Sequence, residues 1–392
     1  MSYSESFNEV MNCIPVADET EIQWGKLKKT QLGSLFRDMS KIQQNPEHHA
    51  EGDVYCHTKC VCEELIKLPD YRESSEEDKV VLFLSALLHD IGKIKCTKIE
   101  DGKIVAPGHA SKSALMAREI LWRDFGLCGS EEKQQLRESI CFLIKYHSFP
   151  PHIIKEKNPE YKIFSVASAG RLAKGFNLKK LCILGDADVL GRECYDKEDY
   201  LERNEYCKMI AEELGCFENP YSFRNEFSQR AYFLKKTTWR DQEMFNDTWG
   251  RVIMLSGLPG TGKDLWISEN YPDLPMVSLD EIRKQLKVLP ADNQGKVISV
   301  AQGMVKGYLR NKQSFVWNAT DITEATRGKW ISLFEQYGAG VEIVFLETEW
   351  EEQLRRNANR KDVVPSGKIE DMLSKLEIPQ PFESEKVRWE IT

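Results

Sequence analysis

A glycine-rich stretch at residues 257–264 carries the most specific chemistry in the sequence. It reads GLPGTGKD and follows the pattern G-x-x-x-x-G-K-[ST], except that Asp264 stands where the hydroxyl residue belongs. In that pattern backbone N–H groups surround phosphates, the lysine reaches the β- and γ-phosphates, and the hydroxyl ligates Mg²⁺. The stretch predicts a nucleotide site in which the metal is bound differently from the usual pattern, because Asp264 replaces the hydroxyl residue. The expected contacts come from Gly257, Gly260, Thr261, Gly262, Lys263 and Asp264.

A second stretch, VSLDEIRKQL, places Asp280 and Arg283 three residues apart after a short apolar run. Ligands of parallel α/β sheets bind where the strands end. A carboxylate there can accept the proton of a hydroxyl that attacks the γ-phosphate, and an arginine one turn later can hold a phosphate of the acceptor. The plainer alternative is an N-cap aspartate beside a solvated arginine.

A third stretch, EEQLRRNANR, contains Arg356 and Arg360, four residues apart. Side chains at this spacing share one face of a helix. The two guanidinium groups are therefore predicted to close over a triphosphate and to stabilise charge in the transition state. A solvated basic face is the common alternative.

Four histidines and two aspartates indicate a metal site. His89 and Asp90 end a predicted helix, where the backbone bends away and lets both side chains reach one ion. Each histidine alone would more often be a packed or surface residue, but the set together predicts ligands for Mn, Fe, Co, Ni, Cu or Zn in preference to Mg. Lys93, one turn past Asp90, is a candidate phosphate contact. The predicted ligands are His57, His89, Asp90, His109, His147 and Asp188.

These residues need two different scaffolds. Apolar residues recur at three- and four-residue intervals from about 54 to 215, which predicts an all-α bundle. Short apolar stretches alternate with helical ones from Arg251 onward, which predicts an α/β domain with a parallel sheet. The segment between is rich in aromatic and charged residues and is predicted to be a packed connector. The predicted domains are 1–215, 216–250 and 251–392.

Composition supports this division and limits the function classes. All seven histidines lie between His48 and His152, and all eleven cysteines between Cys13 and Cys216. The net charge of −8 excludes broad electrostatic attraction to nucleic acid, although an enzyme that grips a strand end can be acidic. The sequence offers no apolar run of transmembrane length and no signal peptide, and its many cysteines favour a reducing compartment. We therefore expect a cytoplasmic protein without a membrane partner.

The C-terminal motifs resemble those of the 5′-hydroxyl polynucleotide kinases, over about residues 251–380. The shared order is GLPGTGK, DEIR at 280–283, NAT at 318–320 and RNANR at 356–360. The resemblance implies ATP or another NTP as donor, with Mg²⁺. It implies that Asp280 is the general base for the 5′-OH and that Arg283 holds the neighbouring phosphate.

The same resemblance makes Arg356 and Arg360 a lid, and places Asn318 and Thr320 beside the nucleotide. Two departures concern the metal. Asp264 replaces the usual Ser or Thr, and Asn318 replaces a frequent acidic residue. We interpret this exchange as a carboxylate moved from the strand end into the loop of an active site.

The N-terminal motifs resemble the HD phosphohydrolases over about residues 50–215, in which one or two transition-metal ions are held by the ligands named above. The whole chain resembles bacterial end-healing enzymes that fuse an HD phosphohydrolase to a P-loop polynucleotide kinase. This implies RNA or DNA strand ends as substrates, and a downstream RNA ligase as a possible partner. One half would phosphorylate a 5′-OH end, and the other would hydrolyse 2′,3′-cyclic or 2′/3′-phosphate ends.

Two alternatives stay open at this stage. The chain could join a kinase to a nucleotidase, both acting on a small nucleotide. It could also be a nucleotide-binding sensor whose loop is made inactive by Asp264. The residues Asp280 and Arg283 separate these alternatives from end healing, because a sensor needs no general base and a small acceptor needs no contact to a second phosphate.

Overall fold

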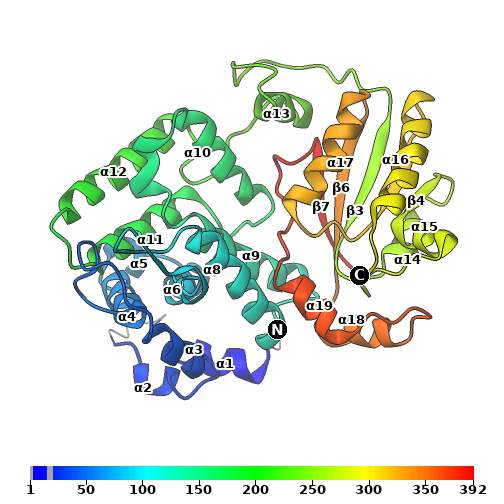
Figure 1. The fold of residues 1–392 in the computed structure, drawn as a ribbon. Coiled ribbons are helices and arrows are strands. Elements are labelled where there is room, and N and C mark those ends of the chain that lie inside the picture. Colours follow the sequence, from blue (N-terminus) through cyan, green and yellow to red (C-terminus); the bar gives the residue numbers. More distant parts are fainter. Residues whose placement is uncertain (1–2, 16–20) are drawn as a thin grey trace. The chain divides into compact units, whose positions relative to one another are not determined.

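A computed structural model describes residues 3–15 and 21–392, which form two compact units (Figure 1). The first unit extends to Tyr221, apart from Gly129–Glu131. The second comprises Ser222–Thr392 together with Gly129–Glu131. Most of the predicted connector, residues 222–250, thus lies in the second unit.

The first unit is helical, which confirms the fold class predicted for it. A two-stranded antiparallel hairpin, β1 with β2, was not predicted. The elements of this unit are α1 (Glu5–Met11), α2 (Trp24–Leu27), α3 (Leu32–Met39), α4 (Val54–Leu65), α5 (Pro69–Arg72), α6 (Glu76–Leu88), α7 (Lys93–Cys96), β1 (Lys98–Glu100), β2 (Lys103–Val105), α8 (His109–Glu119), the π-helix η1 (Ile120–Asp124), α9 (Glu131–Tyr146), the 3₁₀-helix η2 (Pro150–Lys155), α10 (Pro159–Ala167), the 3₁₀-helix η3 (Ser168–Arg171), α11 (Leu178–Leu190) and α12 (Lys197–Glu213).

Helix α6 forms the centre of this unit. Every residue from Val80 to Leu88 is buried, as expected of a helix that is apolar on all sides. Ser75 caps its N-terminus by accepting a hydrogen bond from the Asp78 amide, and three acidic residues in the first turn complement the helix dipole. Helices α4 and α11 both pack against α6. This packing brings together the helices that carry His57, His89 and Asp188.

The second unit is an α/β domain, also as predicted. Its elements are α13 (Glu226–Phe233), β3 (Arg251–Ser256), α14 (Lys263–Asn270), β4 (Met276–Ser278), α15 (Leu279–Leu286), α16 (Gly295–Arg310), β5 (Phe315–Asn318), α17 (Glu324–Gln336), β6 (Gly340–Glu347), α18 (Trp350–Ala358), α19 (Ser366–Leu373) and β7 (Lys386–Ile391). Strand β7 was not predicted.

All five strands of the second unit run parallel, in the order β4-β5-β3-β6-β7. Alternate residues of β3 serve two cores: Val252 and Met254 face one core, and Ile253 and Leu255 face the other. Because the strands are parallel, the segments that follow them gather along one edge of the sheet. Three of the predicted functional stretches follow β3, β4 and β5 at that edge.

Two further properties concern the whole described chain. All eleven cysteines lie in the described residues, and none of them forms a disulfide there. Within residues 3–15 and 21–392, no helix is both long enough and apolar enough to cross a membrane.

Candidate functional site

The first candidate site lies where α4, α6 and α11 meet. The Nε2 atom of His57 is 3.0 Å from Asp188 Oδ1 and 3.4 Å from His89 Nε2. Asp90 Oδ2 lies 3.3 Å from His89 Nε2 and 3.6 Å from His57 Nε2. All four side chains are buried. The predicted ligands from three separate helices therefore converge.

The second carboxylate oxygen of Asp90 faces another pair of imidazoles. Asp90 Oδ1 lies 3.4 Å from His109 Nε2 and 3.9 Å from His147 Nε2. This oxygen is buried and has no hydrogen-bond partner among the described residues. A buried carboxylate oxygen that faces imidazole nitrogens in this way fits a bound cation. The six predicted ligands thus divide into two groups that share Asp90.

Three of the histidines are held in the tautomer that metal binding requires. The Nδ1 atoms of His89, His109 and His147 each contact the carbonyl oxygen three residues earlier, at 2.7, 2.8 and 2.8 Å. A ring that donates its Nδ1 proton to a carbonyl keeps the lone pair on Nε2 for a ligand. His109 is the most exposed of them, with 24% of its side-chain surface accessible, and it lies at the rim of the cluster.

The electrostatics of the cluster keep three of the predicted ligands, Asp90, Asp188 and His147, in the forms that bind a metal. Burial alone would raise the pKa of Asp90, but Lys93 and His89 outweigh it and hold that pKa well below its usual range. Burial likewise opposes ionisation of Asp188, yet Arg192 and His57 keep its pKa low. Burial lowers the pKa of His147 to about 3, so this imidazole is neutral.

Lys93 and Arg192 bring positive charge to the two ligand carboxylates. Lys93 Nζ is 2.7 Å from Asp90 Oδ2 and donates a hydrogen bond of 2.6 Å to Gln44. Arg192, which the sequence did not suggest, forms an ion pair with Asp188 from one turn further along the chain. Lys93, the predicted phosphate contact, therefore lies beside the cluster.

The second candidate site surrounds the loop between β3 and α14. Gly260 has a φ of 88°, and a side chain there would meet the backbone of Gln353 on α18. Lys263 Nζ donates to the carbonyls of Gly257 and Leu258, at 2.9 Å each. Burial lowers the pKa of Lys263 to about 8, against the opposing influence of Asp264. The loop has the shape and donors expected of a phosphate cradle.

The two unusual residues of this site contact each other. The Asn318 amide, at the end of β5, donates a 2.7 Å hydrogen bond to Asp264 Oδ1 in the first turn of α14. The neighbouring Thr320 accepts a hydrogen bond from the Gly257 amide through its carbonyl. Thr261 is buried, and its hydroxyl donates to Leu258 O. The exchanged carboxylate and amide thus occupy adjacent positions.

Asp280 and Arg283 lie in α15, directly after β4, and form an ion pair. Arg283 also donates a 2.9 Å hydrogen bond to Gln294. The N-cap of α15 is Ser278, which excludes the N-cap interpretation of Asp280. The Asp280 carboxylate is 65% exposed, so it is open to an acceptor.

The prediction that Arg356 and Arg360 share a helix face is wrong. Helix α18 ends at Ala358, and the Asn357 side chain forms reciprocal hydrogen bonds with the backbone of Val364. These bonds close a loop that contains Arg360. Arg360 nevertheless lies near enough to Lys263 for its charge to contribute to the lowered pKa of that lysine.

Arg356 remains on α18, next to the phosphate loop. It contacts Glu352 at 2.7 Å and donates a 3.1 Å hydrogen bond to the Thr392 hydroxyl, which itself donates to Thr261 O. Gln353 fixes the same helix to the loop through a 3.0 Å hydrogen bond to Pro259 O. In this structure, therefore, α18 is attached to the phosphate loop.

Comparison with known families agrees with both sites. Residues 53–192 match the HD domain family, and residues 252–379 match an AAA domain family. The chain joins an HD domain to an α/β P-loop domain. The HD match covers all six clustered ligands, and the AAA match covers the phosphate loop, Asp280 and the loop that holds Arg360. Together they support hydrolysis of a phosphate ester in one domain and phosphoryl transfer in the other.

The HD cluster has the donors for one or two divalent ions. His57, His89, Asp188 and one oxygen of Asp90 would hold one ion, and His109 and His147 with the other oxygen a second. A bound ion supplies Lewis acidity toward a phosphate. The protein supplies fixed imidazoles, and Lys93 and Arg192 balance the two carboxylates.

Sequence reasoning missed three residues at these sites. His49 and Glu51 lie against His57, and Glu51 contacts both imidazoles. Asp321, just past β5, has a left-handed backbone with φ 34° and accepts a 2.6 Å hydrogen bond from the Trp317 indole. Asp321 was detectable as an acidic residue directly after the NAT triplet at 318–320. His49 and Glu51 carry no such spacing signal.

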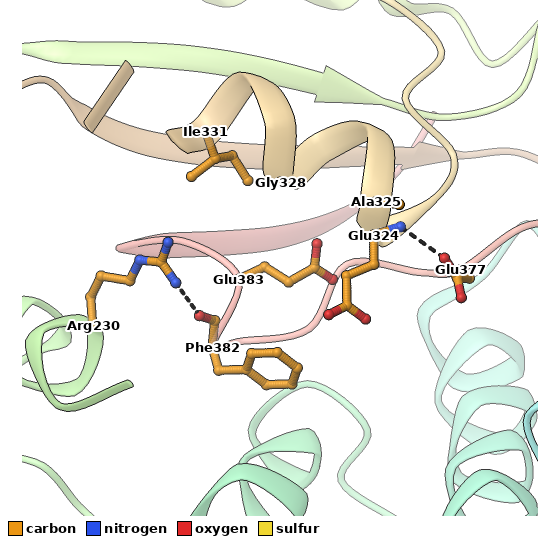
Figure 2. A pocket seen from close by; sticks show the side chains of 8 residues that line it. All are labelled: Arg230, Glu324, Ala325, Gly328, Ile331, Glu377, Phe382 and Glu383. Atoms are coloured by element: carbon orange, nitrogen blue, oxygen red, sulfur yellow. Dashed lines mark hydrogen bonds between the residues drawn. The ribbon is translucent and has the colours of Figure 1, made fainter. Parts of the chain in front are cut away.

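A separate cavity of about 470 Å³ lies between α13, α17 and the segment before β7 (Figure 2). Its charged residues serve structural contacts. Arg230 donates to Phe382 O at 2.6 Å, and Glu383 pairs with the buried Arg327. The Glu324 amide donates to Glu377. None of the predicted catalytic or ligand residues lines this cavity, so we assign neither reaction to it.

Proposed function

We propose that this protein heals the ends of broken nucleic acid strands, with RNA as the expected substrate. The P-loop domain would transfer the γ-phosphate of ATP or another NTP to a 5′-OH end. The HD domain would hydrolyse a 2′,3′-cyclic phosphate or a 2′- or 3′-phosphate. The observation that supports this most is the pair of Asp280 and Arg283, which follows β4 at the sheet edge that also carries Lys263.

The kinase step needs a base, an acceptor contact and charge stabilisation. Asp280 would accept the proton of the 5′-OH while its oxygen forms the new bond to the γ-phosphorus and the nucleoside diphosphate leaves. Arg283 would exchange its contact with Asp280 for the phosphate that follows the terminal nucleoside. That second contact favours a polynucleotide over a small acceptor. Lys263 and Arg356 would stabilise the transferred charge, with Arg360 supplied from the adjoining loop.

Magnesium in the kinase site has an oxygen donor in Asp264. The carboxylate accepts a hydrogen bond from Asn318 Nδ2 through Oδ1, so Asp264 would offer the anionic oxygen and the Asn318 amide would orient it. Carboxylate and amide oxygens suit Mg²⁺. This arrangement supports an active site with an exchanged charge over an inactive sensor loop.

The hydrolytic step would use the six ligands of the HD domain. Removal of a terminal phosphate or opening of a cyclic diester requires water to attack phosphorus and the ribose oxygen to leave. Lys93, which now contacts Asp90, is close enough to the cluster to meet a phosphate there. A nitrogen-rich ligand set favours Mn, Ni, Co, Cu or Zn over Mg for this activity.

One assay tests both halves of the proposal. The full chain is incubated with ATP, Mg²⁺, Mn²⁺ and an RNA oligonucleotide that carries a 5′-OH and a 3′-phosphate, and both ends are resolved. We expect a 5′-phosphate and a 3′-OH. A parallel reaction without ATP should yield only the 3′-OH. The same assay with a DNA oligonucleotide measures the preference for ribose over deoxyribose.

Other outcomes identify the alternatives. Phosphorylation of a nucleoside or mononucleotide with no reaction on the oligonucleotide would identify a small-molecule kinase. ATP binding without turnover on any acceptor would identify a sensor. A downstream RNA ligase would be supported if the doubly healed product, but not the starting oligonucleotide, becomes a ligation substrate.

A further inference from the structure

His57 differs from the other three ligand histidines in what holds its Nδ1 atom. His89, His109 and His147 each use a backbone carbonyl three residues earlier. The Nδ1 atom of His57 instead lies 2.8 Å from Glu51 Oε1. Its Nε2 atom faces the cluster, 3.0 Å from Asp188. A carboxylate thus replaces a neutral carbonyl at one ligand of the four.

The position of His57 in its helix explains the exception. His89 and His147 follow the last turns of α6 and α9, where carbonyl groups have no later amide of the same helix to accept from. His57 lies in the first turn of α4, where carbonyls accept from amides four residues further on. A histidine there needs an acceptor from outside the helix.

Glu51 is itself held firmly. Its side chain is 3% exposed, and Oε1 also accepts a 2.7 Å hydrogen bond from His49 Nδ1. Its other oxygen accepts a 2.9 Å hydrogen bond from the Glu193 amide, and the Glu193 carbonyl accepts one of 3.0 Å from Ala50. Glu193 follows α11, which carries Asp188, so Glu51 connects the segments that supply two ligands. The contact to His57 is close but is not a linear hydrogen bond.

We propose that Glu51 is the positioning residue that fixes His57 as its Nδ1–H tautomer and presents Nε2 to the metal. This inference rests on the hydrolytic half of the proposed function. Carboxylates that accept the second ring proton of a ligand histidine also raise its basicity, and their loss typically weakens metal binding about 10- to 100-fold. His49 shares the carboxylate and limits its movement.

The substitution Glu51→Gln tests this role with almost no change of volume. The native carboxylate accepts hydrogen bonds from His49 Nδ1 and the Glu193 amide, and its Oε1 lies 2.8 Å from His57 Nδ1. A glutamine has one acceptor oxygen and one donor nitrogen, so at least one of these groups loses its partner. The matched control is Glu47→Gln, four residues earlier, because Glu47 is exposed and pairs with Lys103.

Two measurements on the full chain decide the matter. Titration with Mn²⁺ should show about 10-fold or more weaker binding in Glu51→Gln and wild-type binding in Glu47→Gln. Nitrogen NMR of the metal-free, histidine-labelled protein should show a proton on His57 Nδ1 in the wild type and its loss in Glu51→Gln, while Nε2 faces the Asp188 carboxylate in both. An affinity within twofold of wild type together with an unchanged tautomer would overturn the proposal.

Loss of a bound Mn²⁺ ion in Glu51→Gln would also overturn the proposal. If Glu51→Gln bound fewer Mn²⁺ ions with unchanged affinity for the rest, Glu51 would be a ligand and not a positioning residue. Neither measurement uses a substrate. If the wild type hydrolysed no phosphate end, the proposed function would fail, while the tautomer of His57 would still decide the role of Glu51.

Discussion

The two sites of this protein are prepared for their ligands in different ways. In the HD domain the predicted ligand side chains are almost all buried, and three of the four imidazoles already have their Nδ1 atoms hydrogen-bonded to backbone carbonyls. In the P-loop domain the acceptor residues are exposed or half-buried and are paired with each other, as in Asp280 with Arg283. The first site is organised by burial in a helical core. The site in the P-loop domain must exchange internal contacts for substrate contacts. We therefore expect substitutions there to affect turnover more than folding.

The largest expected effect is the loss of one activity at a time, each by mutation of its own site. Lys263→Ala should reduce phosphorylation by at least about 10³-fold, because the β- and γ-phosphates lose their charged ligand, and should leave hydrolysis intact. His89→Ala should do the reverse by removing a ligand. Both activities are measured on the same oligonucleotide. His152→Ala serves as the control for a histidine outside the cluster. Loss of both activities in a folded Lys263→Ala protein would contradict two independent sites.

Replacement of the proposed base should give the next largest effect. Asp280→Asn should reduce the kinase turnover number about 10²- to 10⁴-fold while ATP binding persists, because the lost role is proton acceptance. Glu281→Gln, the next residue on the same helix and also exposed, is the matched control. Turnover near that of wild type in Asp280→Asn would point to another base.

The contact between Asp264 and Asn318 can be tested by a double-mutant cycle. Asp264→Ser should slow the kinase and should make ATP binding less dependent on Mg²⁺, because the site then lacks this carboxylate. Adding Asn318→Asp should recover activity by restoring the common arrangement. We expect a coupling free energy of about 0.5–3 kcal/mol from kcat/KM values. Additive effects would mean that the two residues do not share an ion.

The smallest expected effect concerns the stability of the P-loop domain. Burial raises the pKa of Asp321 to about 6 in the folded protein, against 3.8 for an ordinary aspartate. The folded state therefore binds the proton more tightly than the unfolded state, and stability falls as pH rises from about 4 through 6. Asp321→Asn removes this penalty and should raise the free energy of unfolding by about 1–3 kcal/mol at pH 7.5.

Urea unfolding at two pH values checks this prediction. The difference between Asp321→Asn and wild type should be present at pH 7.5 and should vanish near pH 4. Asp273→Asn, at an exposed position in the same domain, should show no such dependence. A stability gain that is equal at both pH values would assign the effect to packing or hydrogen bonding.

Much of both sites could be predicted because local spacing encodes it. The phosphate loop depends on neighbouring glycines, and the helical HD core depends on apolar periodicity. Contacts between distant segments could not be predicted in this way. The Glu51 side chain accepts a hydrogen bond from the Glu193 amide, and no local sequence pattern predicts that contact.

The error at Arg360 has a different cause. Helical spacing continues through Asn359 in the sequence, but the Asn357 side chain bonds to the Val364 backbone and ends the helix early. Strand β7 was missed because charged residues alternate with apolar ones in KVRWEI, so no apolar run marks it as a buried strand, although its position next to β6 buries it in part. In both cases a tertiary contact outweighs the local pattern.

Asp90 gives the HD domain one further property. Its two oxygens face different imidazole groups, so two ions bound there would share a single anion. Two cations bound to one carboxylate would repel each other, so occupancy of one position should weaken the affinity of the other. Because such thermodynamic coupling is reciprocal, the filling of either position reports on both. The protein should therefore respond to metal in a graded, negatively cooperative manner, with the partly filled state as a distinct species.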